Sequence, residues 1–315
     1  MSLPKKAEIE QAAACVYRVF GPTPDRVWPL ISRQVGTDVR VKHENHTPIG
    51  SFKLRGGLWY MESVDSDVVI SATRGNHGQS VAYAATRSGK RSVIVVPEGN
   101  SREKNAAMEA FGGELVVCGH DFQAAYEYAQ DRASGDRLHL VPSFHERLVA
   151  GVATYSLEFL SAHPGLDVLY VPIGLGSGIC GAVAAREALG LRTEIVGVVA
   201  ETAATYALSF SAGQVVSTNT ADTMADGMAC RVPDPDALEI ILAHVSRVVA
   251  VSDDEIESAM RSYFSGTHNV IEGAGAASLA ALIQERRRVS GLAVGIIASG
   301  GNVDRDVYCR VLSTP

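Results

Sequence analysis

Lys53 is the residue of this sequence best suited to covalent chemistry. It lies in the segment Ser-Phe-Lys-Leu-Arg-Gly at 51–56, which follows a Pro/Gly turn, and a helix is predicted to begin at about Ser51. A lysine in the first turn of a helix meets the positive end of the helix dipole, which disfavours its ammonium form. A lysine with a lowered pKa can form a Schiff base. Taken alone, however, a lysine near a helix start is usually a surface charge.

A glycine-rich loop is the second segment with recognisable chemistry. The apolar run at 167–172 predicts a buried strand, and the loop at 173–181 follows it directly and leads into a predicted helix. Glycines let the backbone approach a ligand closely, and free N–H groups at a helix N-terminus favour an anion such as phosphate. Three interpretations stay open: a single phosphate ester held at 174–177, a dinucleotide, or a turn without a ligand.

The dinucleotide interpretation depends on spacing. Gly176, Gly178 and Gly181 match the Gly-x-Gly-x-x-Gly fingerprint, and Glu201 follows about 20 residues later, where an acid would bind the ribose. A nicotinamide-dependent oxidoreductase that uses the fingerprint at 176–181 is therefore an alternative function. It leaves the segments at 51–56 and 299–302 without a role.

Several motifs occur together along the chain. They are Ser-Phe-Lys-x-Arg-Gly at 51–56, Thr-Arg-Gly-Asn-His-Gly-Gln at 73–79, the glycine loop, Ala-Asp-Gly-Met-Ala at 225–229 and Ser-Gly-Gly-Asn at 299–302. In this order they resemble the fold-type II enzymes that use pyridoxal 5′-phosphate (PLP), in particular the serine/threonine dehydratase and serine racemase group. The resemblance covers roughly residues 22–304.

The resemblance implies a role for each residue around the cofactor. Lys53 would carry PLP as a Schiff base and later move the α-proton of the substrate, and Phe52 would lie against the ring. Asn76 would donate to the 3′-oxygen, and Ser299 would face the pyridine nitrogen. A hydroxyl partner leaves that nitrogen largely unprotonated, which suits a reaction in which a β-leaving group departs promptly. The backbone N–H groups that would hold the phosphate belong to Gly174, Leu175, Gly176, Ser177 and Gly178.

The expected reaction is the loss of water from a β-hydroxy-α-amino acid, such as threonine, serine or a 3-substituted serine, to give a 2-oxo acid and ammonia. The freed Lys53 amine would act as the general base at Cα. A protein that binds PLP without catalysis is an alternative that the intact Lys53, Asn76 and Ser299 disfavour. The residues expected to contact the substrate are Thr73, Arg74, Gly75, His77, Gly78 and Glu272.

Arg74 departs from the pattern of this family. Racemases of the group carry a serine at this position, which serves the second face of Cα, and a guanidinium cannot shuttle protons because it stays charged in proteins. Racemase activity is therefore the disfavoured alternative. Arg74 could instead pair with an acidic β-substituent, as in 3-hydroxyaspartate, or it could point to solvent.

A cation beside the glycine loop is a further feature of the family. Glu201 fits the first of its two acidic ligands, but the second position falls on Ala207. A hard cation needs several oxygen ligands. We therefore predict no metal site and leave a monovalent or weak divalent cation at Glu201 as an open alternative.

Short β-branched runs alternate with helical segments from about residue 67, which predicts parallel sheets covered by helices. The resemblance implies an α/β fold of the tryptophan synthase β type, with two doubly wound lobes and the cofactor in the cleft between them. We expect a large PLP-binding domain at 1–66 and 143–315 and a small substrate-loop domain at 67–142. The predicted strands are 67–71, 92–96, 114–118, 138–141, 167–172, 194–200 and 293–298, and the predicted helices 79–88, 102–111, 122–133, 146–162 and 179–189.

Composition limits the partners and the location. The net charge of −7 disfavours a nucleic-acid partner, which needs a clustered basic surface. No apolar run is long enough for a membrane span, and five scattered cysteines without a paired spacing suggest reduced thiols, so we expect a cytoplasmic protein. The family favours homodimers. Because only a short stretch follows Ser299, we expect no regulatory domain of the type found on biosynthetic threonine dehydratases.

Overall fold

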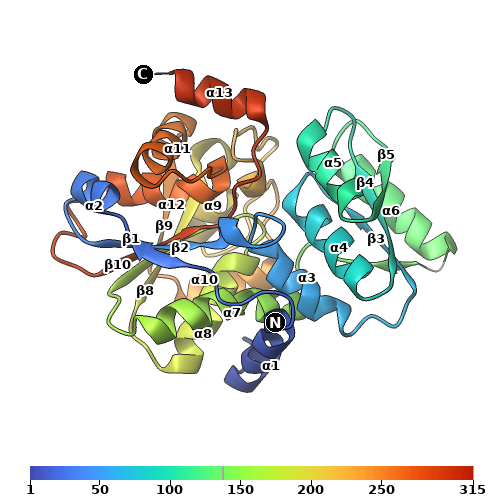
Figure 1. Ribbon diagram of the computed structural model, residues 1–315, viewed down its shortest axis with the longest axis horizontal. Coiled ribbons are helices and arrows are strands. Elements are labelled where there is room, and N and C mark those ends of the chain that lie inside the picture. Colours follow the sequence, from blue (N-terminus) through green and yellow to red (C-terminus); the bar gives the residue numbers. More distant parts are fainter. Residues whose placement is uncertain (137, 315) are drawn as a thin grey trace.

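The computed structural model describes residues 1–136 and 138–314 and contains two separate sheets (Figure 1). The larger is six-stranded, in the order β1-β2-β10-β7-β8-β9. Its neighbouring strands are parallel, except that β1 runs antiparallel to β2. The strands are β1 (Asp25–Val27), β2 (Val39–His43), β7 (Val168–Pro172), β8 (Glu194–Ala200), β9 (Arg247–Val251) and β10 (Val294–Ala298).

Helices cover both faces of the large sheet. One face packs against α2, α11, α12 and α13, and the other against α7, α8, α9 and α10. Strand residues alternate between these two cores, so β7 and β10 are apolar throughout, as parallel strands buried on both faces must be. The helices are α1 (Lys6–Tyr17), α2 (Pro29–Val35), α3 (Lys53–Met61), α7 (Glu146–Ala162), α8 (Ser177–Leu189), α9 (Thr205–Ala212), α10 (Pro235–His244), α11 (Asp253–Thr267), α12 (Gly273–Gln284) and α13 (Arg305–Ser313).

The smaller sheet lies on the right in Figure 1 and is four-stranded, in the order β5-β4-β3-β6. All of its pairs are parallel. One face packs against α3 and α4, and α6 covers the other. Its elements are β3 (Val68–Ala72), α4 (Asn76–Arg87), β4 (Arg91–Val96), α5 (Arg102–Ala110), β5 (Gly113–Val117), α6 (Phe122–Asp136) and β6 (His139–Leu140).

The predicted alternation of parallel strands and helices is confirmed. Each predicted strand is present, although β6 has only two residues, and each predicted helix is found within a few residues of its expected bounds. Ser101 is the N-cap of α5 and accepts from the Lys104 N–H, and Gly112 ends that helix with a φ of +91°. The sequence did not predict β9 or the helices beyond residue 200.

Within the described ranges, three short 3₁₀ segments are also present: η1 (Glu44–His46), η2 (Glu201–Ala203) and η3 (Asp226–Met228). In the described part of the chain, no helix combines the length and the apolar character needed to cross a bilayer. The carboxyl ends of β3, β7 and β10 lead into the segments that carry the predicted site residues. Ligands of open parallel sheets bind at this edge.

Candidate active site

A cavity of about 760 Å³ lies where the ends of these strands meet. It takes residues from both sheets, since the loop after β3 and the loop after β7 both line it. The predicted residues that line it are Phe52, Lys53, Thr73, Arg74, Gly75, Asn76, His77, Gly174, Leu175, Gly176, Ser177, Gly178, Glu272 and Ser299. The sequence motifs, far apart in the chain, therefore come together around one space.

Lys53 is the first residue of α3, and its amine donates to Ser177 Oγ at 3.2 Å. Its Nζ also lies 5.2 Å from the centroid of the Phe52 ring. Burial lowers the pKa of Lys53 to about 8, which is the direction that the sequence predicts. The amine is thus neutral in a useful fraction of molecules near neutral pH, as a nucleophile must be.

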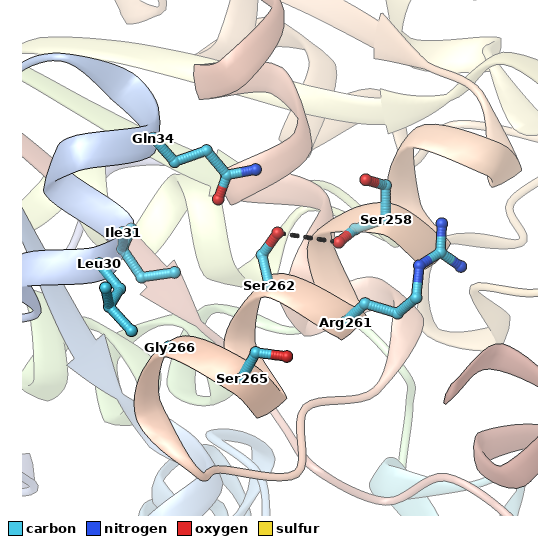
Figure 2. A pocket seen from close by; sticks show the side chains of 8 residues that line it. All are labelled: Leu30, Ile31, Gln34, Ser258, Arg261, Ser262, Ser265 and Gly266. Atoms are coloured by element: carbon cyan, nitrogen blue, oxygen red, sulfur yellow. Dashed lines mark hydrogen bonds between the residues drawn. The ribbon is translucent and has the colours of Figure 1, made fainter. Parts of the chain in front are cut away.

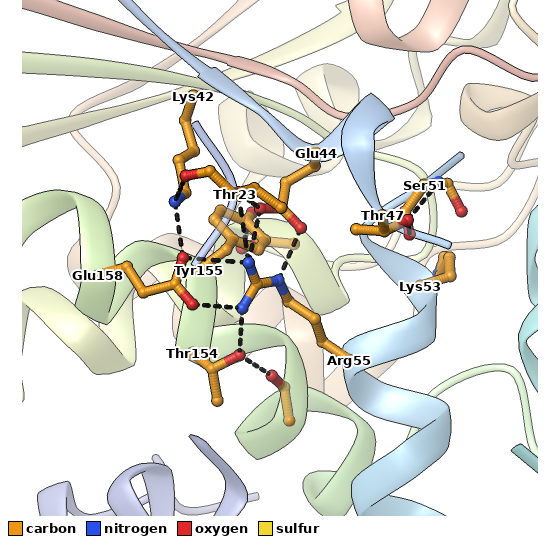
Figure 3. A network of polar contacts seen from close by, with 12 residues as sticks. Thr23, Lys42, Glu44, Thr47, Ser51, Lys53, Arg55, Thr154, Tyr155 and Glu158 are labelled. Carbon is orange, nitrogen blue, oxygen red and sulfur yellow. Dashed lines mark hydrogen bonds and ion pairs between the residues drawn. The ribbon is translucent and has the colours of Figure 1, made fainter. Parts of the chain in front are cut away.

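Arg55, two residues further along α3, is held on the opposite side by a buried ionic network (Figure 3). Its Nε donates to Glu44 at 2.7 Å and its Nη1 to Glu158 at 2.6 Å. Nη2 donates to both carboxylates, so each carboxylate accepts from two guanidinium nitrogens. Lys42 donates to the same Glu158 at 2.6 Å. The network ties the start of α3 to η1, β2 and α7. Glu44 of the His-Glu-Asn-His segment at 43–46 therefore has a structural role.

The glycine loop wraps the N-terminus of α8. Gly176 is the N-cap residue with a φ of +105°, a conformation that side chains rarely allow. A Cβ at Gly174 would collide with the carbonyl oxygen of Gly227. Among the described residues, the backbone N–H groups of 174–178 have no acceptor. Such free donors at a helix N-terminus suit a phosphoryl group.

The loop at 73–78 is organised by its threonine. Thr73 Oγ1 accepts from the N–H groups of Gly75 and Gly78, at 3.0 and 3.1 Å. Gly78 does not line the cavity, so its N–H supports the loop rather than facing a substrate. The N–H groups of Arg74, Asn76 and His77 have no acceptor in the described residues and are the ones available to a carboxylate.

Two side chains of this loop have distinct environments. Arg74 is exposed at the cavity, and its guanidinium has no partner within the described ranges. Burial and the nearby Lys53 charge lower the pKa of His77 to about 3, while the Val141 backbone opposes this shift. His77 is therefore neutral, and its buried Nε2 has no hydrogen-bond partner in the part of the chain described.

Asn76 links the two sides of the cavity. Its Nδ2 donates to Glu272 Oε1 at 2.6 Å, and its Oδ1 accepts from Asn302 Nδ2 at 2.8 Å. Glu272 is the N-cap residue of α12, and burial raises its pKa against the opposing effects of Lys104 and Asn76. Ser299 follows β10, and its carbonyl accepts from the Phe52 N–H at 3.0 Å. Ser299, which lines the cavity, is thus hydrogen-bonded directly to Phe52, the residue before Lys53.

Lys104 and Asp226 line the cavity as well, and the sequence predicted no role for either. The Lys104 amine donates to Asp226 at 2.9 Å. Burial disfavours the charged amine, but Glu272 and Asp226 outweigh this effect and raise the pKa of Lys104. Lys104 lies in the polar first turn of α5, residues 102–105, where nothing in the sequence marks it as buried.

Two further features lie apart from this cavity. Glu201 is exposed in η2 and is not among the lining residues, and in the described ranges no three His, Cys, Asp or Glu side chains are grouped as metal ligands. A groove of about 370 Å³ lies between α2 and α11 (Figure 2). It shares no residue with the large cavity, and its one charged lining side chain is Arg261.

The residues of the large cavity fit PLP. Lys53 offers an amine of lowered pKa for the aldehyde, the loop at 174–178 offers free N–H donors for the phosphate, and Ser299 offers a hydroxyl. Phe52 provides an aromatic face beside the amine. A dinucleotide would leave the buried Lys53 amine without a chemical role.

Comparison with known proteins agrees with this fit. A model of the pyridoxal-phosphate dependent enzyme family matches residues 16–300. An L-threonine ammonia-lyase of Geobacter sulfurreducens is 35% identical over 87% of this chain and 69% of its own length. An L-threo-3-hydroxyaspartate ammonia-lyase of Saccharomyces cerevisiae is 27% identical, with 99% of this chain and 98% of that protein covered.

The structure is similar to that of the processed form of threonine deaminase isoform 2 from Solanum lycopersicum, with a TM-score of 0.91, 27% identity and coverage of 98% and 94% of the two chains. Several biosynthetic threonine dehydratases are longer, and the chain spans 57% to 60% of their length. These likenesses confirm the predicted fold class and remove the oxidoreductase alternative. The chain belongs to the pyridoxal-phosphate dependent enzyme family, in its fold-type II group of ammonia-lyases and dehydratases.

Proposed function

We propose that this protein removes water and then ammonia from a β-hydroxy-α-amino acid and releases a 2-oxo acid. The observation that carries this proposal is the contact of Lys53 Nζ with Ser177 Oγ, at 3.2 Å, inside the cavity that also contains Asn76 and Ser299. It brings an amine whose pKa is lowered to about 8 to the edge of the glycine loop. The likeness to threonine ammonia-lyases supports the same reaction.

The roles of the chain's own residues follow from their positions. PLP, when bound, supplies an electron sink for the charge that develops at Cα. Lys53, whose lowered pKa makes more of its amine neutral than in an ordinary lysine, removes the α-proton, and Ser177 keeps the amine directed at the glycine loop. The free N–H groups of Arg74, Asn76 and His77 hold the substrate carboxylate. The neutral His77 adds no charge that would compete with Lys53.

Arg74 supports a finer proposal about the substrate. Its exposed guanidinium lines the cavity and has no partner among the described side chains. A guanidinium in this situation pairs well with a carboxylate, because two N–H groups can bind both oxygens. We infer that the preferred substrate carries an acidic β-substituent, as the named substrate of the yeast relative does.

A panel of β-hydroxy amino acids tests both proposals. 2-Oxo acid release is measured for threonine, serine and 3-hydroxyaspartate with the wild type, Arg74→Ala and Arg231→Ala. Arg231 is the matched control, because it is an exposed arginine that lines the same cavity. Arg74→Ala should lower kcat/KM for 3-hydroxyaspartate by about 10- to 100-fold and leave threonine within about threefold. Equal losses for all substrates would exclude the role in recognition.

Racemisation remains the alternative that can be checked in the same samples. It needs a proton-transfer group on the second face of Cα, and the family's serine is replaced by Arg74, which stays charged. We expect unreacted L-serine to keep its configuration while 2-oxo acid accumulates. Chiral chromatography of the remaining serine measures this directly.

Several organisational features also remain proposals. The small sheet, built from strands between 68 and 140, supports a small domain at 67–142, with a large domain at 1–66 and 143–315. The homodimer, the cytoplasmic location and a cation at Glu201 stay predictions from the sequence. Size-exclusion chromatography with light scattering tests the first of these three.

A further inference from the structure

Two buried tyrosines contact the glycine loop from outside the cavity. The Tyr155 hydroxyl, on α7, donates to the Gly178 carbonyl at 3.2 Å, and the Tyr206 hydroxyl, on α9, donates to the Leu175 carbonyl at 2.9 Å. Both side chains are 1% exposed, and neither lines the cavity. Their hydroxyls therefore act on the backbone of the loop and not on a ligand.

The Tyr206 contact sets the direction of a donor. In a trans peptide the C=O of Leu175 and the N–H of Gly176 point in opposite directions. A carbonyl held toward Tyr206 therefore turns the Gly176 N–H away from Tyr206. Gly176 lines the cavity, and its N–H has no acceptor in the described residues. The hydroxyl itself is fixed, because it also accepts from the Asp234 N–H at 3.0 Å.

The Tyr155 contact fixes the first turn of α8. Gly178 is the second residue of that helix, and a Cβ placed on it would lie 3.5 Å from the Tyr155 hydroxyl and 3.8 Å from the Phe52 ring. The rings of Tyr155 and Phe52 meet edge to face, with centroids 6.0 Å apart. The tyrosine therefore contacts both the loop and the residue that precedes Lys53.

Tyr155 also belongs to the helix that holds Lys53 in place. Its neighbours on α7, Thr154 and Glu158, accept from Arg55 at 3.1 and 2.6 Å (Figure 3). A Cβ at Gly56 would lie 2.9 Å from the Leu148 carbonyl oxygen, so α3 and α7 pack backbone to backbone. One helix thus fixes the amine through Arg55 and the glycine loop through Tyr155.

We propose that Tyr155 and Tyr206 are positioning residues for the cofactor phosphate: the Tyr206 hydroxyl holds the Leu175 carbonyl outward so that the Gly176 N–H faces the phosphoryl oxygens, and the Tyr155 hydroxyl anchors the first turn of α8, whose free N–H groups complete the site. The inference rests on the proposed function, since it requires PLP to occupy the cavity. Carbonyl oxygens turned toward a phosphate would repel it, whereas N–H groups bind it. Loss of one hydroxyl should therefore weaken binding of the phosphate and leave the chemistry at the amine intact.

Comparison of PLP with pyridoxal, which lacks the phosphate, separates these two effects. The dissociation constant of each compound is measured by Schiff-base absorbance for the wild type, Tyr155→Phe and Tyr206→Phe. Each variant should bind PLP about 3- to 10-fold more weakly, the net effect of one hydrogen bond, and bind pyridoxal within twofold of the wild type. Tyr263→Phe is the matched control, since its buried hydroxyl has no partner within the described chain and lies in the core between α11 and the sheet.

The outcomes distinguish the proposals. Equal weakening of PLP and pyridoxal, or no change in either, overturns the positioning role. Failure of the wild type to form a hydride-trapped adduct on Lys53 overturns the proposed function instead. Inorganic phosphate is a second probe, because it should compete with PLP less well in either variant than in the wild type. Equal competition in all variants counts against the inference, and melting temperatures verify that each variant is folded.

Discussion

Lys53 and Arg55 both lie in the first turn of α3, and their side chains meet opposite environments. Figure 3 shows the network around Arg55. Arg55 is fully buried, and its guanidinium donates to Glu44, Glu158, Thr154 and Thr23. Among the described residues, the Lys53 amine has one hydrogen bond, to Ser177. Burial opposes both charges, but the two carboxylates outweigh it and raise the pKa of Arg55, whereas the pKa of Lys53 falls to about 8.

The difference shows how one short helix separates stability from reactivity. A buried charge with matched partners stabilises a unique arrangement, while a buried amine without a countercharge loses its proton at a lower pH and is then nucleophilic. The side of α3 that carries Arg55, with its carboxylate partners, faces the core. The side that carries Lys53, which has no carboxylate partner among the described residues, faces the cavity. Substitutions on the two sides should therefore affect different measurements.

Replacement of Lys53 should produce the largest effect on activity. Lys53→Ala removes both the attachment point and the base, so kcat/KM should fall by at least ~10³-fold, while the free energy of unfolding stays within about 1 kcal/mol of the wild type. Lys53→Arg is the matched control, because it keeps the charge but cannot form a Schiff base. Hydride trapping followed by peptide mass spectrometry measures the attachment. An adduct on Lys104, which lines the same cavity, would contradict the assignment.

Replacement of Arg55 should have the complementary effect. Arg55→Met leaves Glu44 and Glu158 buried without their main partner, which should lower the free energy of unfolding by about 3–5 kcal/mol. Urea titration measures this loss. Arg91→Ala, which breaks an ion pair exposed on both sides, is the control and should change stability little. A similar loss in both variants would mean that the buried network has no special role.

The sequence predicted the parts of this comparison that depend on local pattern. Buried parallel strands are continuous apolar runs, so β7 and β10 were recognisable, and the β-branched run of β9 could have been included. The motifs at 51–56 and 174–178 placed Lys53 and the glycine loop on helix starts, where the structure has them. Local spacing is sufficient for such features because neighbouring residues define them.

Features that depend on tertiary packing were not predictable. Lys104, Tyr155 and Tyr206 are single polar residues on helices, and their importance comes from partners far away in the sequence: Asp226, Gly178 and Leu175. The same holds for Glu44, whose pairing with Arg55 appears only when η1 and α3 pack together. No periodicity or spacing encodes these contacts.

The pH dependence of Lys53 reactivity separates the effect of burial on the pKa of Lys53 from the effect of nearby charges. In the cofactor-free chain the amine should react with an acylating reagent with a midpoint near pH 8, well below the ~10.4 of an ordinary lysine. Below the midpoint the rate should fall about tenfold per pH unit, because only the neutral amine reacts. Since burial alone causes the shift, Glu158→Gln should leave the midpoint unchanged. A midpoint that moves by a unit would show that the ionic network acts on Lys53 directly.

The smallest expected effect concerns Glu272, a carboxyl that is buried like Glu44 but lines the cavity. Glu44 is paired with Arg55, but Glu272 accepts from the Asn76 amide, and burial raises its pKa. A carboxyl whose folded-state pKa is raised stabilises the fold below its unfolded pKa, and this contribution is lost as the pH rises through the folded value. Glu272→Gln keeps the acceptor for Asn76 and removes the charge, so the stability difference should stay within about 1 kcal/mol.

That difference should move in the variant's favour between pH 4 and pH 8. Parallel urea titrations of the wild type and Glu272→Gln at these two pH values measure it, and Glu285→Gln, at a carboxyl whose pKa Arg247 and Tyr170 lower, should show the opposite trend. Glu272→Gln could instead lose stability relative to the wild type as the pH rises. This result would show that the charge on Glu272 stabilises the Lys104 ammonium, so that a charge pair is present at the cavity as well. Arg55 and Lys53 would then differ in their access to the cavity and not in the balance of charges around them.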